Sequence, residues 1–133
     1  MSEPLIYISK YRVKEGKRKQ FEEFYKKVFA IVEASEPQFI AFHAFLNEDG
    51  TEMTNIQVHP DTASMDFHMQ VLRENWDESF GEYSQMLDIV SVEYFGTPPA
   101  SALEMDLQLD LSPILNPLHI AGFTRTSAKN QTA

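Results

Sequence analysis

The sequence of 133 residues contains no cysteine, and this absence removes several kinds of site. A disulfide framework, a cysteine-ligated zinc or iron–sulfur centre and a cysteine nucleophile are all excluded. Glycine is scarce, with five residues, and neither GxGxxG nor a P-loop occurs, which argues against a loop that cradles phosphates. A chain of this length is expected to bury one hydrophobic core without a metal or a disulfide to stabilise it.

Long apolar runs are missing as well. The unbroken apolar stretches are only a few residues long, whereas a membrane-spanning helix needs roughly 20. The N-terminal residues also lack the apolar segment of about 7–15 residues that is typical of a signal peptide. We therefore expect a cytoplasmic protein that does not bind a membrane.

Positive charge is concentrated at the start of the chain and is almost missing afterwards. Residues 1–27 carry eight Lys or Arg and four Asp or Glu, whereas residues 28–124 carry one cation, Arg73, and sixteen acids. The net charge of the whole chain is −9. Because nucleic-acid phosphates require a basic face, this distribution argues against nucleic acid as a partner. The early basic residues are interpreted as the solvent-facing side of a helix.

Hydrophobic periodicity divides most of the chain into strands and helices. Alternation predicts strands over residues 5–13, 39–46, 52–59 and 89–95. Apolar spacing of three and four residues predicts helices over 17–34 and 61–75, followed by a shorter helical piece over 77–87. The order β-α-β-β-α-β is that of a ferredoxin-like fold, in which an antiparallel sheet carries its helices on one face. We therefore predict an α+β protein.

The residues after this pattern are predicted to form an extension. Gly96-Thr97-Pro98-Pro99 ends the last strand, a helix is expected over 100–111, and a short added strand is expected over 118–126. These expectations place the domain at residues 1–97, the helix–strand extension at 98–126 and a polar tail at 127–133.

The predicted sheet carries more large aromatic residues than two helices can bury. They are Tyr7, Tyr11, Phe39, Phe42 and Phe45. A contiguous apolar face left exposed is typical of an interface. We therefore predict a homodimer in which a second copy covers the free face of the sheet.

Four histidines, His43, His59, His68 and His119, are candidate acid–base groups, since imidazole titrates near neutral pH and no thiol is present. His68 lies on the apolar face of the second helix. His43 and His59 lie on the predicted hairpin, whose register the sequence leaves open. A three-residue turn places these two on the same face of the sheet, whereas a two- or four-residue turn places them on opposite faces.

Two less specific interpretations remain open beside these. One is a metal site built from His43, His68 and a third histidine. No HExxH-like spacing supports such a site, so we predict no metal. The other is that His43 is a core histidine that forms hydrogen bonds with its neighbours. The aromatic residues near the second helix, Trp76 and Phe80 among them, either line an apolar ligand pocket or simply fill the core.

Two segments resemble a known family. IYISKYRVKEGKRKQFEEFYKKV and AFHAFLNEDGTEMTNIQVHPDTASMDFHM are similar to the antibiotic biosynthesis monooxygenase-like members of the dimeric α+β barrel superfamily. The shared features are a strand ending in V-K-x-G before a long amphipathic helix, an aromatic strand pair around DGT, and an H-P-D entry to the second helix. The resemblance covers about residues 4–96 and implies that the ferredoxin-like sheet forms a dimeric α+β barrel.

The resemblance also implies a function. The family includes haem-degrading enzymes, which use an Asn on the first strand and a Trp that precedes a His. In this sequence the first strand has Ser9 and no Asn, and His68 precedes Trp76. These differences argue against haem breakdown. The other implied activity is that of a small monooxygenase without a cofactor, acting on an aromatic or quinol-like molecule bound between sheet and helices. In such an enzyme the protein binds, desolvates and deprotonates the substrate.

The residues expected to do this are a base, His68 or His43, and a set of substrate contacts. The substrate contacts are Tyr11, Phe42, Asn55, Gln57, Trp76 and Phe80. The alternative hypothesis is a non-catalytic dimeric module, small-molecule-binding or stress-associated, whose histidines are structural. A module with purely structural histidines predicts a pocket that is too small or too well filled to admit a ligand.

Overall fold

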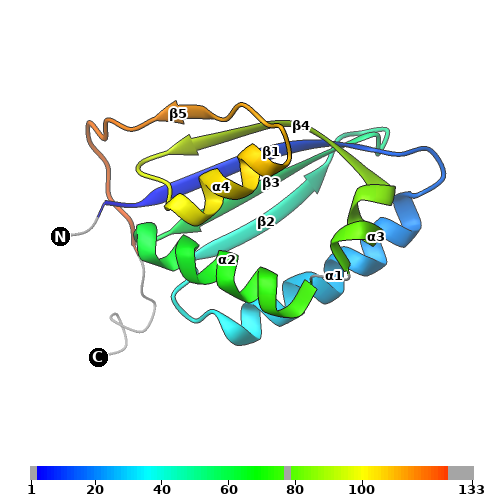
Figure 1. Cartoon of the computed structure of the whole chain (residues 1–133), viewed down its shortest axis with the longest axis horizontal. Coiled ribbons are helices and arrows are strands. Elements are labelled where there is room, and N and C mark those ends of the chain that lie inside the picture. The colour runs from blue at the N-terminus through cyan, green and yellow to red at the C-terminus, as the bar shows by residue number, and fades with distance from the viewer. Residues whose placement is uncertain (1–2, 77–78, 126–133) are drawn as a thin grey trace.

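The computed structural model describes residues 3–76 and 79–125 and shows a mixed α+β fold (Figure 1). Its elements follow in the order β1 (Leu5–Val13), α1 (Arg18–Ser35), β2 (Ala41–Leu46), β3 (Glu52–His59), α2 (Thr62–Trp76), α3 (Ser79–Met86), β4 (Leu87–Phe95), α4 (Ala100–Gln108) and β5 (Ile114–Asn116). The five strands lie in the order β2-β3-β1-β4-β5, and only the β4–β5 pair is parallel. The predicted β-α-β-β-α-β pattern is confirmed.

One face of the sheet carries the helices and the core. In β1 every second residue is buried, from Leu5 to Val13, and in β3 the buried residues are Met53, Asn55, Gln57 and His59. This period of two is what a strand with one covered face requires. Two core clusters form on the covered face: α1 and α3 pack over one end of the sheet, and α2 and α4 pack over the other.

The register of the β2–β3 hairpin places its two histidines on opposite faces. Ala41 pairs with Val58 and Leu46 with Met53, which leaves the four residues 48–51 as the turn. Within it Gly50 has a φ of 74°, a conformation that glycine adopts without steric cost. His59 therefore lies on the helix-covered face, whereas His43 is exposed on the other face.

The C-terminal region differs from the prediction. The predicted helix over 100–111 ends at Gln108, and the added strand is Ile114–Asn116, not 118–126. Residues 118–125 form no strand, and β5 is the strand that pairs with the edge of β4. Residue 126 and the predicted polar tail lie outside the described residues.

Four of the five aromatic residues predicted to be in excess on the sheet lie on its covered face, contrary to the prediction. Tyr7 and Tyr11 are buried under the helices, and Phe39 and Phe42 stack on one another next to His59 and His68. Only Phe45 of the five is exposed on the uncovered face, at 59%. Tyr11, Phe39 and Phe42 pack with residues of α1, and Tyr7 packs with residues of α2 and α4. No helix within the described residues has the length and apolarity needed to cross a membrane.

Candidate functional site

A cavity of about 460 Å³ lies between the covered face of the sheet and the helices. Strands β1, β3 and β4 supply its floor, and α1, α2 and α4 supply side chains to its walls. Ligand sites in proteins enclose roughly 300–1,000 Å³ and are mostly apolar with a few polar groups, and this cavity has both properties. Its buried polar groups include two pairs with a carboxylate, Glu36–His68 and Tyr94–Asp106, and the amide of Asn55.

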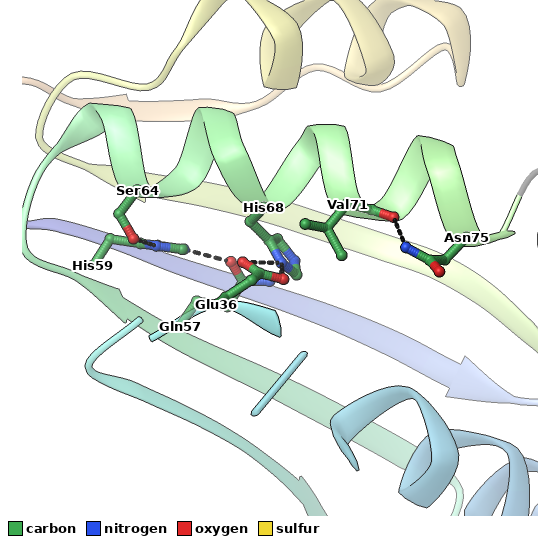
Figure 2. A network of polar contacts seen from close by, with 7 residues as sticks. All are labelled: Glu36, Gln57, His59, Ser64, His68, Val71 and Asn75. Carbon is green, nitrogen blue, oxygen red and sulfur yellow. Dashed lines mark hydrogen bonds and ion pairs between the residues drawn. The ribbon is translucent and has the colours of Figure 1, made fainter. Parts of the chain in front are cut away.

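The first pair joins a histidine to a carboxylate. His68 points from α2 toward the sheet, and its Nδ1 lies 2.8 Å and 3.0 Å from the two carboxylate oxygens of Glu36 (Figure 2). Glu36 sits directly after α1, where its backbone N–H donates to Val32 and Pro37 prevents another helical turn. Both side chains are almost completely buried. A carboxylate placed this way orients the imidazole and stabilises its protonated form.

A chain of polar contacts determines which nitrogen of His68 carries the proton. The amide nitrogen of Gln57 lies 3.5 Å from His68 Nε2 and can only donate, so Nε2 accepts and Nδ1–H donates to Glu36. On its other side Gln57 accepts from His59 Nε2 at 2.9 Å, and Ser64 donates its hydroxyl to His59 Nδ1 at 2.8 Å (Figure 2). In this arrangement the lone pair is on His68 Nε2, and its partner is the amide nitrogen of Gln57 at the long distance of 3.5 Å.

His59 supports this arrangement as a neutral group. Burial lowers the pKa of His59 to about 3. A neutral His59 keeps one N–H for Gln57 and one lone pair for Ser64, as the contacts require. The aromatic ring of Phe39 stacks on it with ring centres 4.0 Å apart. His59 is thus a positioning residue behind Gln57 and His68.

A buried amide lies further along β3. Asn55 donates from Nδ2 to the hydroxyl of Tyr25, while its buried Oδ1 has no hydrogen-bond partner among the described residues. Burial raises the pKa of Tyr25, so its hydroxyl keeps its proton at neutral pH. A buried acceptor without a partner costs free energy, and Asn55 lines the cavity, where a ligand donor would satisfy it.

The second pair joins a tyrosine to a carboxylate. Tyr94 on β4 donates its hydroxyl to Asp106 Oδ2 on α4 at 2.6 Å, and both residues are buried and line the cavity. Burial, opposed in part by this hydrogen bond, raises the pKa of Asp106. Burial and the neighbouring Asp106 raise the pKa of Tyr94, so the phenol remains protonated.

The structure brings most of the predicted site residues together. Five of them line the cavity: Tyr11, Phe42, Asn55, Gln57 and His68. The predicted base His43 lies on the opposite face of the sheet, is exposed, and is not among the described residues that line this cavity. The side chains of Trp76 and Phe80 lie outside the described residues.

Two charged residues of the site were missed by the sequence reasoning. Glu36, in Ser35-Glu36-Pro37, has the pattern of an ordinary helix end, and Asp106 lies in the predicted helix over 100–111, which was assigned to the extension and not to the site. The signal that was available is spacing: Glu36 follows the buried Val28 and Val32 of α1 at four-residue intervals, and Asp106 follows the buried Ala102 of α4 by four residues. Among residues 3–76 and 79–125 no group of three or more His, Asp or Glu is arranged to hold a metal ion.

Solved structures similar to this chain share its fold. MupZ from Pseudomonas fluorescens superposes with a TM-score of 0.69 at 21% identity, covering 96% of this chain and 94% of that one. A conserved protein from Methanosarcina mazei Go1 gives 0.58 at 20% identity, over 69% and 90% of the two chains. A mutant of SnoaB, a cofactor-independent oxygenase from Streptomyces nogalater, gives 0.53 at 14% identity, over 74% and 97%.

A comparison with curated proteins found no match. The sequence does match a family model, described as antibiotic biosynthesis monooxygenase, over residues 4–71. This region runs from β1 into α2 and includes Glu36, Asn55, Gln57 and His68. Over these residues the family match agrees with the resemblance of the two sequence segments, with the strand order and with the fold of the solved structures. The chain belongs to the antibiotic biosynthesis monooxygenase family.

Proposed function

We propose that the protein is a cofactor-independent monooxygenase acting on an aromatic, quinol-like molecule with a free phenolic hydroxyl. The observation that carries this proposal is the buried Glu36–His68 pair, whose histidine lines the wall of an aromatic cavity. Family membership supports the reaction class, and the similarity of fold to SnoaB, named a cofactor-independent oxygenase, agrees with it.

The chemistry requires a base and a dry cavity. His68 Nε2 takes the phenolic proton, and the electron-rich ring carbon para to the oxygen then forms a bond to O2. Return of the proton from His68 gives a hydroperoxide. Loss of the ring C–H proton and cleavage of the O–O bond leave a second carbonyl group and release one water. The substrate supplies all four electrons, one oxygen atom enters the product, and the other leaves as water.

The described side chains suit these steps. Glu36 stabilises the protonated imidazole, and Asn55 Oδ1 offers an acceptor to a substrate hydroxyl. Tyr11, Tyr25 and Phe42 present aromatic faces to the cavity, which favours a flat aromatic ligand. The alternative hypothesis, a module with structural histidines, expects a filled pocket, and a cavity of about 460 Å³ argues against that part of it.

Oxygen consumption with 1-naphthol tests the proposal. We expect the purified, chelator-treated protein to consume one O2 for each 1,4-naphthoquinone formed, with no hydrogen peroxide released. Product absorbance, an oxygen electrode and a peroxide assay measure the three quantities. Peroxide released in place of water would show an oxidase, and no turnover of 1-naphthol or of its hydroxylated analogues would contradict the proposal.

We also propose that the protein is a homodimer assembled on the uncovered sheet face. Cross-strand rows on this face place Ile6 beside Val58 and Ile8 beside Ile56, with Ala41 and Phe95 at the ends of the first row. Outside the sheet, the segment that follows β5 carries three apolar side chains, Leu118, Ile120 and Phe123, which are 91%, 96% and 81% exposed. Apolar surface of this extent is typical of an interface.

Replacing a central residue of this face should separate the copies. We expect wild-type protein to show twice the 15.3 kDa chain mass in light scattering, and Ile56→Lys to show the monomer mass, because a buried unpaired ammonium is strongly unfavourable. Glu23→Lys, which places the same side chain at an exposed position of α1, should remain dimeric. A monomeric wild type would refute the assembly.

A further inference from the structure

The cavity has a polar group at each end of a row that crosses the sheet. Tyr94 pairs with Tyr7 across β4 and β1, and Tyr7 pairs with Gln57 across β1 and β3. Two strand spacings therefore separate the backbones of Tyr94 and Gln57, a distance of about 10 Å. Gln57 contacts His68 at one end, and Tyr94 contacts Asp106 at the other.

Helix α4 is held over the cavity by its own contacts with α2 and the sheet. Figure 1 shows α4 beside α2 on the same side of the sheet. Ser101 donates its hydroxyl to Asp66 on α2 at 2.6 Å, and Ala102 is buried in a cluster with Met65 and Met69 of α2. Four residues after Ala102, on the same helix face, Asp106 is directed at Tyr94. This helix lies beyond residues 4–71 that match the family model, so the family match itself does not include Asp106.

The Tyr94–Asp106 pair presents acceptors to the cavity. Tyr94 uses its single hydroxyl hydrogen on Asp106 Oδ2, so the lone pairs of the phenol and the second carboxylate oxygen are what remain for a ligand. Among the described residues, Tyr94 is the hydrogen-bond partner of the Asp106 side chain. A buried carboxylate with one neutral donor is under-solvated, and a second donor would stabilise it.

We propose that Asp106, positioned by Tyr94, is a second substrate anchor that accepts a hydrogen bond from a hydroxyl group at the far end of the substrate. This assignment rests on the proposed function for the position of the first hydroxyl, at His68. It names the substrate class more narrowly: a fused-ring aromatic with hydroxyl groups at both ends. The residues between the anchors, Tyr7 and the methionines of α2, are apolar or aromatic and suit the ring system.

Binding of three naphthalenes under nitrogen tests the anchor without any turnover. The ligands are 2,6-dihydroxynaphthalene, 2-hydroxynaphthalene and 6-methoxy-2-hydroxynaphthalene, which has an acceptor but no donor at its far end. We expect calorimetry on the wild-type protein to give roughly ten- to a hundredfold tighter binding of the diol than of the other two, the range of a hydrogen bond to a charged group. Equal binding of diol and methoxy compound would overturn the proposal, and this comparison requires no variant.

A matched pair of substitutions then separates anchoring from a structural role. Asp106→Asn keeps the size of the side chain and replaces the charged acceptor with an amide, so the preference for the diol should fall at least tenfold. Asp110→Asn makes the same change at an exposed residue and should keep the preference. If the Asp106→Asn protein also keeps the preference for the diol, the Tyr94–Asp106 pair only holds α4 in place, and the proposal is wrong.

The outcomes also separate this inference from the proposed function. A diol preference that depends on Asp106 in a protein that turns over no naphthol supports the anchor and refutes the oxygenase. Turnover of 1-naphthol without any preference for the diol supports the oxygenase and refutes the anchor.

Discussion

His68→Ala is expected to reduce turnover of 1-naphthol by about 10²- to 10⁴-fold, the contribution usual for a positioned general base. The reduction should appear in kcat, because the imidazole removes the proton whose loss makes the ring carbon reactive to O2. Glu36→Gln should reduce kcat by about 10²-fold or more. The amide presents an N–H to His68 Nδ1, which favours the tautomer with its proton on Nε2 and removes the lone pair from that nitrogen.

The matched control for this experiment is His43→Ala. His43 is an exposed histidine of the same hairpin region on the opposite face of the sheet, so its replacement should leave kcat within about twofold of wild type. Circular dichroism and thermal unfolding of each variant verify that the fold is kept. Full turnover by a folded His68→Ala protein would remove His68 as the base, and loss of activity in His43→Ala would transfer that role to the other face.

The second large effect is a loss of stability in acid caused by His59. The folded protein holds the pKa of His59 near 3 by burial, whereas the unfolded chain has an ordinary imidazole near 6.5. Below pH 6.5 the unfolded state therefore binds a proton that the folded state does not bind. The free energy of unfolding should fall by about 1.4 kcal/mol for each pH unit between pH 6 and pH 4, and His59 gives this contribution in full only above pH 6.5.

Urea unfolding of wild type and His59→Gln at several pH values between 7 and 4 measures this contribution. Glutamine stays neutral throughout, so the variant is expected to be less stable at pH 7 and to lose stability more slowly as the pH falls. The difference between the two slopes isolates His59 from the carboxylates that titrate in both proteins. His43→Gln, at an exposed position, should retain the wild-type slope, and equal slopes for wild type and His59→Gln would show that His59 is protonated in the folded protein.

Local pattern was sufficient for much of the fold. The strands β1 and β3 have the predicted bounds, because alternation over eight or nine residues ended by Gly or Pro leaves little freedom in placing a strand. The same reasoning failed for residues 118–126. Alternation shows that a segment suits a strand, but a strand also needs a neighbour with free backbone groups, and that neighbour is decided by the rest of the chain.

The candidate site was predictable only in part for a related reason. His68, Gln57 and Asn55 stood out because polar residues on faces that are otherwise apolar are visible in the periodicity. The partner of His68 comes from 32 residues earlier in the chain, and the sequence holds no local mark of that contact. His43 appeared equivalent to His59 until the register of the hairpin was known, since a shift of one residue exchanges the faces.

The sequence by itself determined the absence of thiol chemistry, the acidic character after the first helix, the α+β order of elements and the family resemblance, because these depend on composition and on neighbours along the chain. Only the tertiary structure decided which histidine faces the cavity, that Glu36 holds it, and that α4 brings Asp106 to the opposite end. Each of those three facts depends on a contact between different strands or helices. Such contacts follow from which hydrophobic faces pack together, and a single strand or helix carries no record of its partner.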